Sequence, residues 1–135
     1  MKKISFSILI VFASSIGTMG QDWSQWRGVE RQGIWHEDGI VDQFPDDGLE
    51  VKWRVPIGSG YAGPAVADGR VFVLDWTEDS SSRTLDGTER LLVLDEETGG
   101  ELWTAEWQTS YRALMGSYAI GPRATPTVDG DSVFV

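Results

Sequence analysis

Three tryptophans close to the N-terminus are the first residues whose type and spacing indicate ligand binding. Trp23, Trp26 and Trp35 lie in one short stretch of the sequence, and their rings could form a flat platform for a sugar or a quinone. The alternative is that they pack this stretch against the rest of the fold, since large aromatic side chains mainly serve burial. We expect packing.

Residues that could hold a metal or act in acid–base chemistry are few. His36 is the one histidine and cysteine is absent, so the ligand sets typical of zinc are missing. A group of acidic residues follows, but it lacks the Gly and the Glu that a calcium loop requires at fixed positions. We therefore assign no catalytic, cofactor-binding or metal-binding residue. We expect a solvated surface at His36, Asp42, Asp46, Asp47 and Glu50.

Composition and charge exclude several classes of protein. The 135-residue chain has 21 acidic against 11 basic residues and a formal net charge of −10. This charge argues against nucleic acid or an anionic membrane surface as a partner. The 7 Trp, 3 Tyr and 5 Phe are too large an apolar content for a disordered tail. The absence of cysteine excludes a disulfide-stapled domain and a lipoprotein anchor.

Residues 1–20 have the pattern of a secretory signal peptide. Basic Lys2 and Lys3 precede the apolar run Ile4–Ala13, and small residues before Gln21 offer a cleavage site. The alternative, a membrane span, would need about 20 predominantly apolar residues, and polar residues from Ser14 onward interrupt this run. We expect a periplasmic or secreted mature chain with no stable membrane anchor.

The mature chain is predicted to be all-β. Asp-Gly dipeptides, which are typical of hairpin turns, separate short β-branched and aromatic runs, and helical spacing is missing apart from a short permissive stretch at 109–115. At the Asp68-Gly69 turn, Val66 should face Val71, and both faces of the resulting ribbon are apolar. The expected strands are 49–55, 63–67, 71–76, 89–95, 102–107, 124–129 and 133–135.

An internal repeat selects among the β architectures. The sequence from Pro64 to Val73 aligns without a gap on that from Pro126 to Val135, at an offset of 62 residues, so that Gly130-Asp131 takes the turn positions. Val51-Lys52-Trp53 matches Glu101-Leu102-Trp103 at an offset of 50 residues. Periods of this size made of four short strands are typical of β-propeller blades. One full blade is expected, about 64–107.

The segment Val93–Trp103 (VLDEETGGELW) resembles the repeat of PQQ-like, quinoprotein-type β-propellers, in which a Leu-Asp strand end turns through Thr-Gly and returns to a Trp. The opening DWSQWRG at 22–28, GSGY at 58–61 and GPRATPTV at 121–128 are similar to exported members common in planctomycete-type bacteria. The resemblance spans nearly all of 22–135. It implies structural roles for the repeat residues Asp95, Thr98, Gly99, Trp103, Trp53, Pro64 and Pro126.

The resemblance also implies a domain organisation. Residues 21–48 would pack on a propeller that begins at 49, and the strand at 49–55 would close the ring from the outer position of the last blade. Because Val135 falls where a strand should continue, we expect the chain to be the N-terminal fragment of a longer propeller.

Two functions remain open. The first is a non-catalytic binding or assembly scaffold for a protein, peptide or glycan partner, similar to the assembly lipoprotein of the outer-membrane Bam complex. The second is a PQQ-dependent alcohol or sugar dehydrogenase, which would use PQQ and calcium. No cofactor is evident in the sequence itself. Dehydrogenases of related fold typically carry adjacent cysteines, which this sequence lacks.

Overall fold

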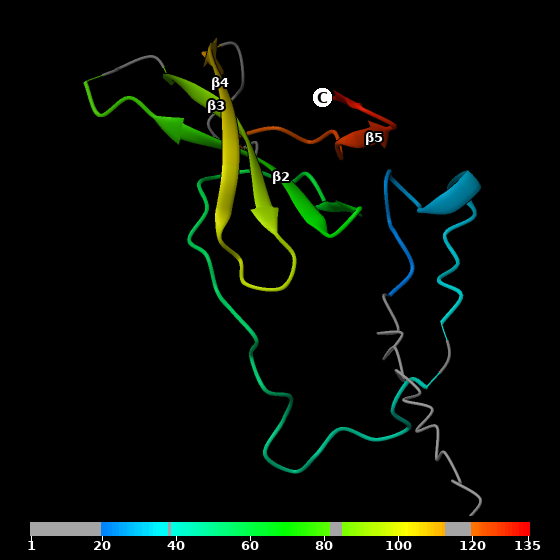
Figure 1. The fold of residues 1–135 in the computed structure, drawn as a ribbon. Coiled ribbons are helices and arrows are strands. Elements are labelled where there is room, and N and C mark those ends of the chain that lie inside the picture. The colour runs from blue at the N-terminus through cyan, green and yellow to red at the C-terminus, as the bar shows by residue number, and fades with distance from the viewer. Residues whose placement is uncertain (1–19, 38, 82–84, 113–119) are drawn as a thin grey trace, which may run out of the picture.

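The computed structural model describes residues 20–37, 39–81, 85–112 and 120–135, and the predicted signal peptide lies almost entirely outside these residues. The described chain is all-β, as predicted, with one four-stranded antiparallel sheet and one two-stranded hairpin (Figure 1). The strands are β1 (Ala65–Ala67), β2 (Arg70–Glu78), β3 (Asp86–Asp95), β4 (Glu101–Ser110), β5 (Thr127–Asp129) and β6 (Ser132–Phe134).

The large sheet is a meander in the order β1-β2-β3-β4, so every connection is a hairpin. In the first hairpin Val66 pairs with Val71 and Ala67 with Arg70, which confirms the register predicted from the sequence. Asp68 and Gly69 have φ angles of 52° and 70°, the positive values that a two-residue turn between twisted strands requires.

Both faces of the sheet are apolar near its centre. On one face Phe72 and Val93 lie opposite each other and are almost fully buried, and the partly buried side chains of Val128 and Val133 pack against this core. The other face carries Leu92 and Leu94, which are also buried. The sheet therefore needs cover on both sides, and β5–β6 provides part of it.

The second hairpin repeats the first. Val128 pairs with Val133 and Asp129 with Ser132, so the turn falls at Gly130-Asp131 as the internal alignment predicts. β5 and β6 begin at the positions that correspond to the starts of β1 and β2 at the 62-residue offset. In Figure 1 this hairpin lies beside the β1–β2 end of the sheet.

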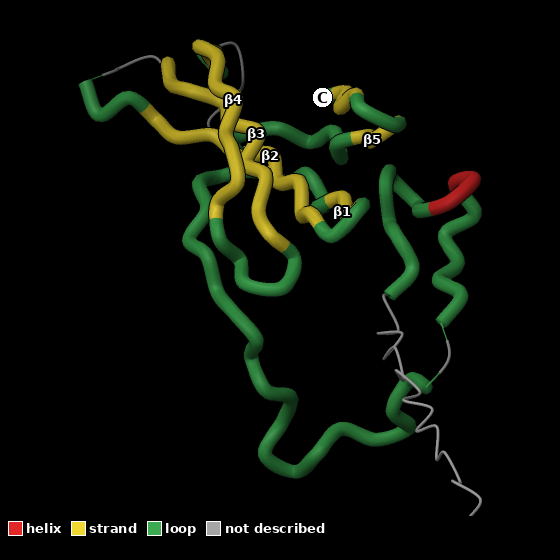
Figure 2. Tube along the Cα trace, in the orientation of Figure 1, coloured by secondary structure: helices red, strands yellow, loops and turns green. Residues whose placement is uncertain are grey.

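The prediction of a strand at 49–55 is wrong. This stretch is extended chain without a strand, part of the long loop that Figure 2 shows between the N-terminal segment and β1. A strand needs a neighbouring edge along its length, and within the described residues no strand pairs with it. The N-terminal segment also contains a short 3-10 helix, η1 (Val29–Arg31), that the sequence did not predict.

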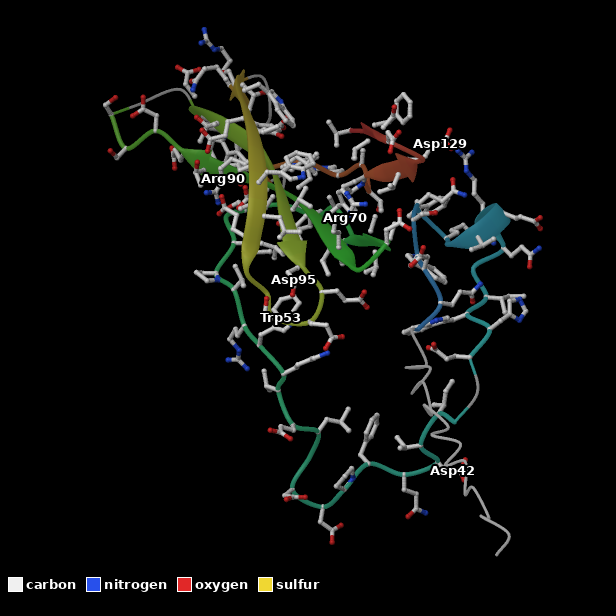
Figure 3. All side chains as sticks on the ribbon, in the orientation of Figure 1. Asp42, Trp53, Arg70, Arg90, Asp95 and Asp129 are labelled. Atoms are coloured by element: carbon white, nitrogen blue, oxygen red, sulfur yellow. The ribbon has the colours of Figure 1, made fainter. Side chains whose placement is uncertain are left out.

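The part of the chain with assigned structure contains no helix with the length and apolarity needed to cross a bilayer. The predicted helix-permissive stretch at 109–115 begins inside β4, and its residues 113–115 lie outside the described residues. His36 and the acidic residues of the long loop are exposed, as predicted, and Asp42 lies far from the sheet (Figure 3).

Candidate functional site

The turn between β3 and β4 is held together by Asp95. Its carboxylate accepts hydrogen bonds from the Thr98 hydroxyl at 2.7 Å and from the Thr98 backbone N–H at 2.8 Å. These bonds, the hydroxyl one first, lower the pKa of Asp95 below its ordinary value because they stabilise the charged form. The Gly99 N–H closes the turn on the Asp95 carbonyl at 2.8 Å.

Trp53 docks on this turn from the long loop that precedes β1. Its indole Nε1–H donates to the Glu96 carbonyl at 2.8 Å, and Figure 3 shows Trp53 next to Asp95. The ring lies so close to Gly99 that an added Cβ would stand 2.6 Å from its Cδ2 atom. Gly99 also has a φ of 69°, so both its backbone and its surroundings favour glycine.

Four of the sequence-predicted repeat residues therefore come together: Asp95, Thr98, Gly99 and Trp53. The other three lie elsewhere. Trp103 sits on β4 opposite Val93, with 42% of its surface exposed. Pro64 and Pro126 directly precede β1 and β5, and the Pro126 side chain is almost fully buried.

A buried ion pair that sequence reasoning missed joins β2 to β3. Asp75 is fully buried and accepts two hydrogen bonds from Arg90, from Nε at 2.9 Å and from Nη2 at 2.6 Å. The Gly58 N–H donates a third at 2.5 Å. The bond to Asp75 raises the pKa of Arg90. The available signal was an acidic residue inside an otherwise apolar strand, Val71–Trp76, opposite a basic residue in the next one.

A cavity of about 740 Å³ lies at the end of the sheet where β4 finishes, and Val135, the residue after β6, forms part of its lining. The Glu89 carboxylate on its wall accepts a bond from Trp107 Nε1 at 2.7 Å and another from the Tyr111 hydroxyl. Burial, followed by this bond to Glu89, raises the pKa of the Tyr111 phenol. Arg123 also lines the cavity, and its guanidinium lies 5.9 Å from the centre of the Tyr61 ring. The sequence analysis did not predict this cluster.

The N-terminal segment forms main-chain hydrogen bonds to the first strand of each hairpin, β1 and β5. Trp23 pairs with Val66 of β1 through both main-chain bonds, N–H to carbonyl at 2.8 Å and the reverse at 3.0 Å. The next residue, Ser24, accepts the N–H of Val128 in β5 at 2.8 Å. Val66 and Val128 are equivalent positions of the internal repeat. Trp23 and Ser24 thus bond to equivalent positions of the two hairpins.

The three N-terminal tryptophans line one cavity of about 540 Å³. Trp23 is partly buried, and its ring centre lies 6.4 Å from that of Trp35. Trp26 and Trp35 are 65% and 58% exposed. Trp23 therefore packs against the fold, whereas Trp26 and Trp35 expose more than half of their surfaces in the part of the chain that the structure describes.

The described residues provide no group of three or more side chains able to hold a metal ion. The same residues line the two cavities described above. Comparisons with protein-family models, curated proteins and solved structures give no match to this chain.

Proposed function

We propose that the chain belongs to an exported β-propeller of the PQQ-like type, in which it acts as a non-catalytic binding or assembly scaffold. The observation that carries the proposal is the docking of Trp53 on the Asp95–Gly99 turn of the repeat that follows it. Trp103 occupies the equivalent place at the 50-residue offset. On this proposal, Trp103 docks in the same way on the corresponding turn of the next repeat.

The two equivalent hairpins support the same architecture. A sheet that is apolar on both faces is stable only between neighbours, and a ring of such sheets covers every face. β5–β6 lies against the core face of the first sheet, as the first two strands of a following blade would. The proposal that the protein is exported is supported by the basic residues and the apolar run at the start of the sequence.

The alternative function is a PQQ-dependent alcohol or sugar dehydrogenase that also needs calcium. The larger cavity favours it in part, because Trp107, Tyr111 and Arg123 offer aromatic and cationic groups. However, Trp107 and Tyr111 already donate hydrogen bonds to Glu89 in this cavity, so these polar groups pair with one another. We therefore propose the scaffold as the function.

The two functions are separated by adding PQQ and Ca²⁺ to the full-length exported protein. We expect no bound chromophore and no reduction of an electron-accepting dye with alcohols or aldoses. Stoichiometric uptake of the quinone together with substrate-dependent dye reduction would contradict the scaffold and establish the dehydrogenase.

A further inference from the structure

We propose that the cavity lined by Trp23, Trp26 and Trp35 binds an uncharged sugar chain. The exposed indoles would stack on pyranose rings, and Arg27 would donate hydrogen bonds to their hydroxyl groups. This inference rests on the proposed binding role, for which it names the ligand class. Every residue that lines the cavity lies in the described chain.

The aromatic floor of the cavity is fixed in place. Trp23 is anchored by two main-chain bonds to Val66, and Gly28 lies so close to its ring that an added Cβ would stand 2.6 Å from Cε3. Trp35 packs on the anchored ring at an interplanar angle of 58°. A ligand would meet rings that are already ordered, which reduces the entropy lost on binding.

The two outer rings are available to a ligand. Trp26 and Trp35 expose more than half of their surfaces and line the same cavity, so a ligand in the cavity can reach both rings. Arg27 lies 5.7 Å from the Trp26 ring and donates one N–H to the Gln32 carbonyl at 3.4 Å. A guanidinium carries five N–H donors, so Arg27 can hold this position and still donate to a ligand.

The lining distinguishes a neutral sugar from other ligands. Among the described residues, the cavity wall has one charged side chain, Arg27, and no carboxylate that would hold a cationic ligand. Polyanionic chains are disfavoured by the net charge of −10 over the whole chain. A peptide added as a strand is also disfavoured, since the outer edge of β1 beside the cavity is already paired with Trp23.

The size and composition agree with this assignment. About 540 Å³ lies within the range of small-ligand sites, roughly 300–1,000 Å³. Pro64 and Val66 provide further apolar wall, and Thr125, which directly precedes Pro126, adds a hydroxyl group. An apolar surface with a few polar groups suits a ring that has C–H faces and a rim of hydroxyls.

The experiment is calorimetric titration of the full-length exported protein with cellohexaose, xylohexaose and hexagalacturonate. We expect saturable binding of at least one of the two neutral oligosaccharides. Trp26→Ala and Trp35→Ala should each weaken it about tenfold, which corresponds to ~1.4 kcal/mol of lost stacking. Phe44→Ala removes another exposed aromatic ring, 72% exposed on the long loop, and should leave the affinity unchanged.

The proposal is overturned if neither neutral oligosaccharide binds, if hexagalacturonate binds better than both, or if the Trp26→Ala/Trp35→Ala double variant binds as well as the native protein. Protection of both indoles from acrylamide quenching in the ligand-free protein would also overturn it, because another part of the chain would then cover them. None of these outcomes affects the quinone test above, so failure of the sugar site is distinguishable from failure of the scaffold.

Discussion

The charge of Asp75 is stabilised by one side chain above all. Asp75 is completely buried, and Arg90 holds both of its carboxylate oxygens. Removing one partner of such a pair leaves a buried charge without compensation, whereas an exposed pair contributes little. The molecule offers an exposed pair for comparison, Arg70 and Asp68, with 3.7 Å between Nη2 and Oδ2.

We therefore expect Arg90→Met to lower the free energy of unfolding by about 3 kcal/mol. Arg70→Met should lower it by less than about 1 kcal/mol. The measurement is urea denaturation of the full-length protein and the two variants under identical conditions. Equal effects of the two substitutions would show that the Asp75–Arg90 pair is not an important source of stability.

The Asp95 turn gives a prediction about pH. Its pKa is lowered in the folded chain from an ordinary value of 3.8. The stabilisation is therefore complete above that value and is lost as the pH falls through the lower, folded pKa. Thr98→Val removes the hydroxyl donor, whereas Thr98→Ser keeps it.

We expect Thr98→Val to be less stable than the native protein at about pH 6, with the difference shrinking as the pH falls from 3.8 through the lowered, folded pKa, because protonated Asp95 no longer gains from the bond. Thr98→Ser should follow the native curve. Urea midpoints across this pH range provide the test, and a difference between Thr98→Val and the native protein that stays constant with pH would refute the role of the carboxylate.

At the scale of elements, the docked indole explains why Gly99 stands where it does. Gly130, in the second hairpin, also has a positive φ, 55°, but an added Cβ there would meet nothing within 4 Å. The two glycines therefore share the backbone requirement and differ only in the presence of Trp53.

Both Gly99→Ala and Gly130→Ala should lose about 1 kcal/mol through backbone strain. Gly99→Ala should lose more and should also shift tryptophan emission to longer wavelength, because the added methyl group displaces Trp53 into solvent. Thermal unfolding and fluorescence of both variants are the measurements. Identical spectra for the two variants would mean that Trp53 does not dock on the turn in solution.

The sequence predicts pairings between neighbouring strands better than pairings between segments that are distant in the sequence. The register of both hairpins followed from short turns between apolar runs, because a two-residue turn fixes which residues face each other. The strand at 49–55 could not be judged in this way, since its strand state depends on a partner distant in the sequence. The same limit applies to Trp23, whose pairing with Val66 joins segments that no local pattern connects.

The site was predicted less completely than the fold. The Asp95 turn and Trp53 were predicted from the repeat. The Asp75–Arg90 pair and the Glu89 cluster depend on which side chains are buried. The alternation of polar and apolar residues does not reveal burial when both faces of a strand are apolar. The exposure of Trp26 and Trp35 was missed for a related reason: the type of an aromatic residue favours burial, while the surrounding chain decides whether burial is achieved.

At the scale of the whole molecule, the described chain exposes many large apolar side chains. They include Leu102 and Trp103 on β4, Phe134 on β6, and Val51 and Ile57 on the long loop. Such surfaces and open sheet edges promote association. We expect residues 21–135, expressed alone, to self-associate in sedimentation experiments, and a monomer that unfolds cooperatively would contradict this.

We propose that the sheet β1–β4 is one copy of a recurring unit whose outer tryptophan docks on the following copy. The most direct measurement is a high-resolution structure of the full-length exported protein. We expect a closed ring of four-stranded sheets in which Trp103 Nε1 donates to a main-chain carbonyl in the turn of the next sheet, as Trp53 does to Glu96. A structure in which Trp103 lies in solvent, or in which helices follow β6, would contradict it.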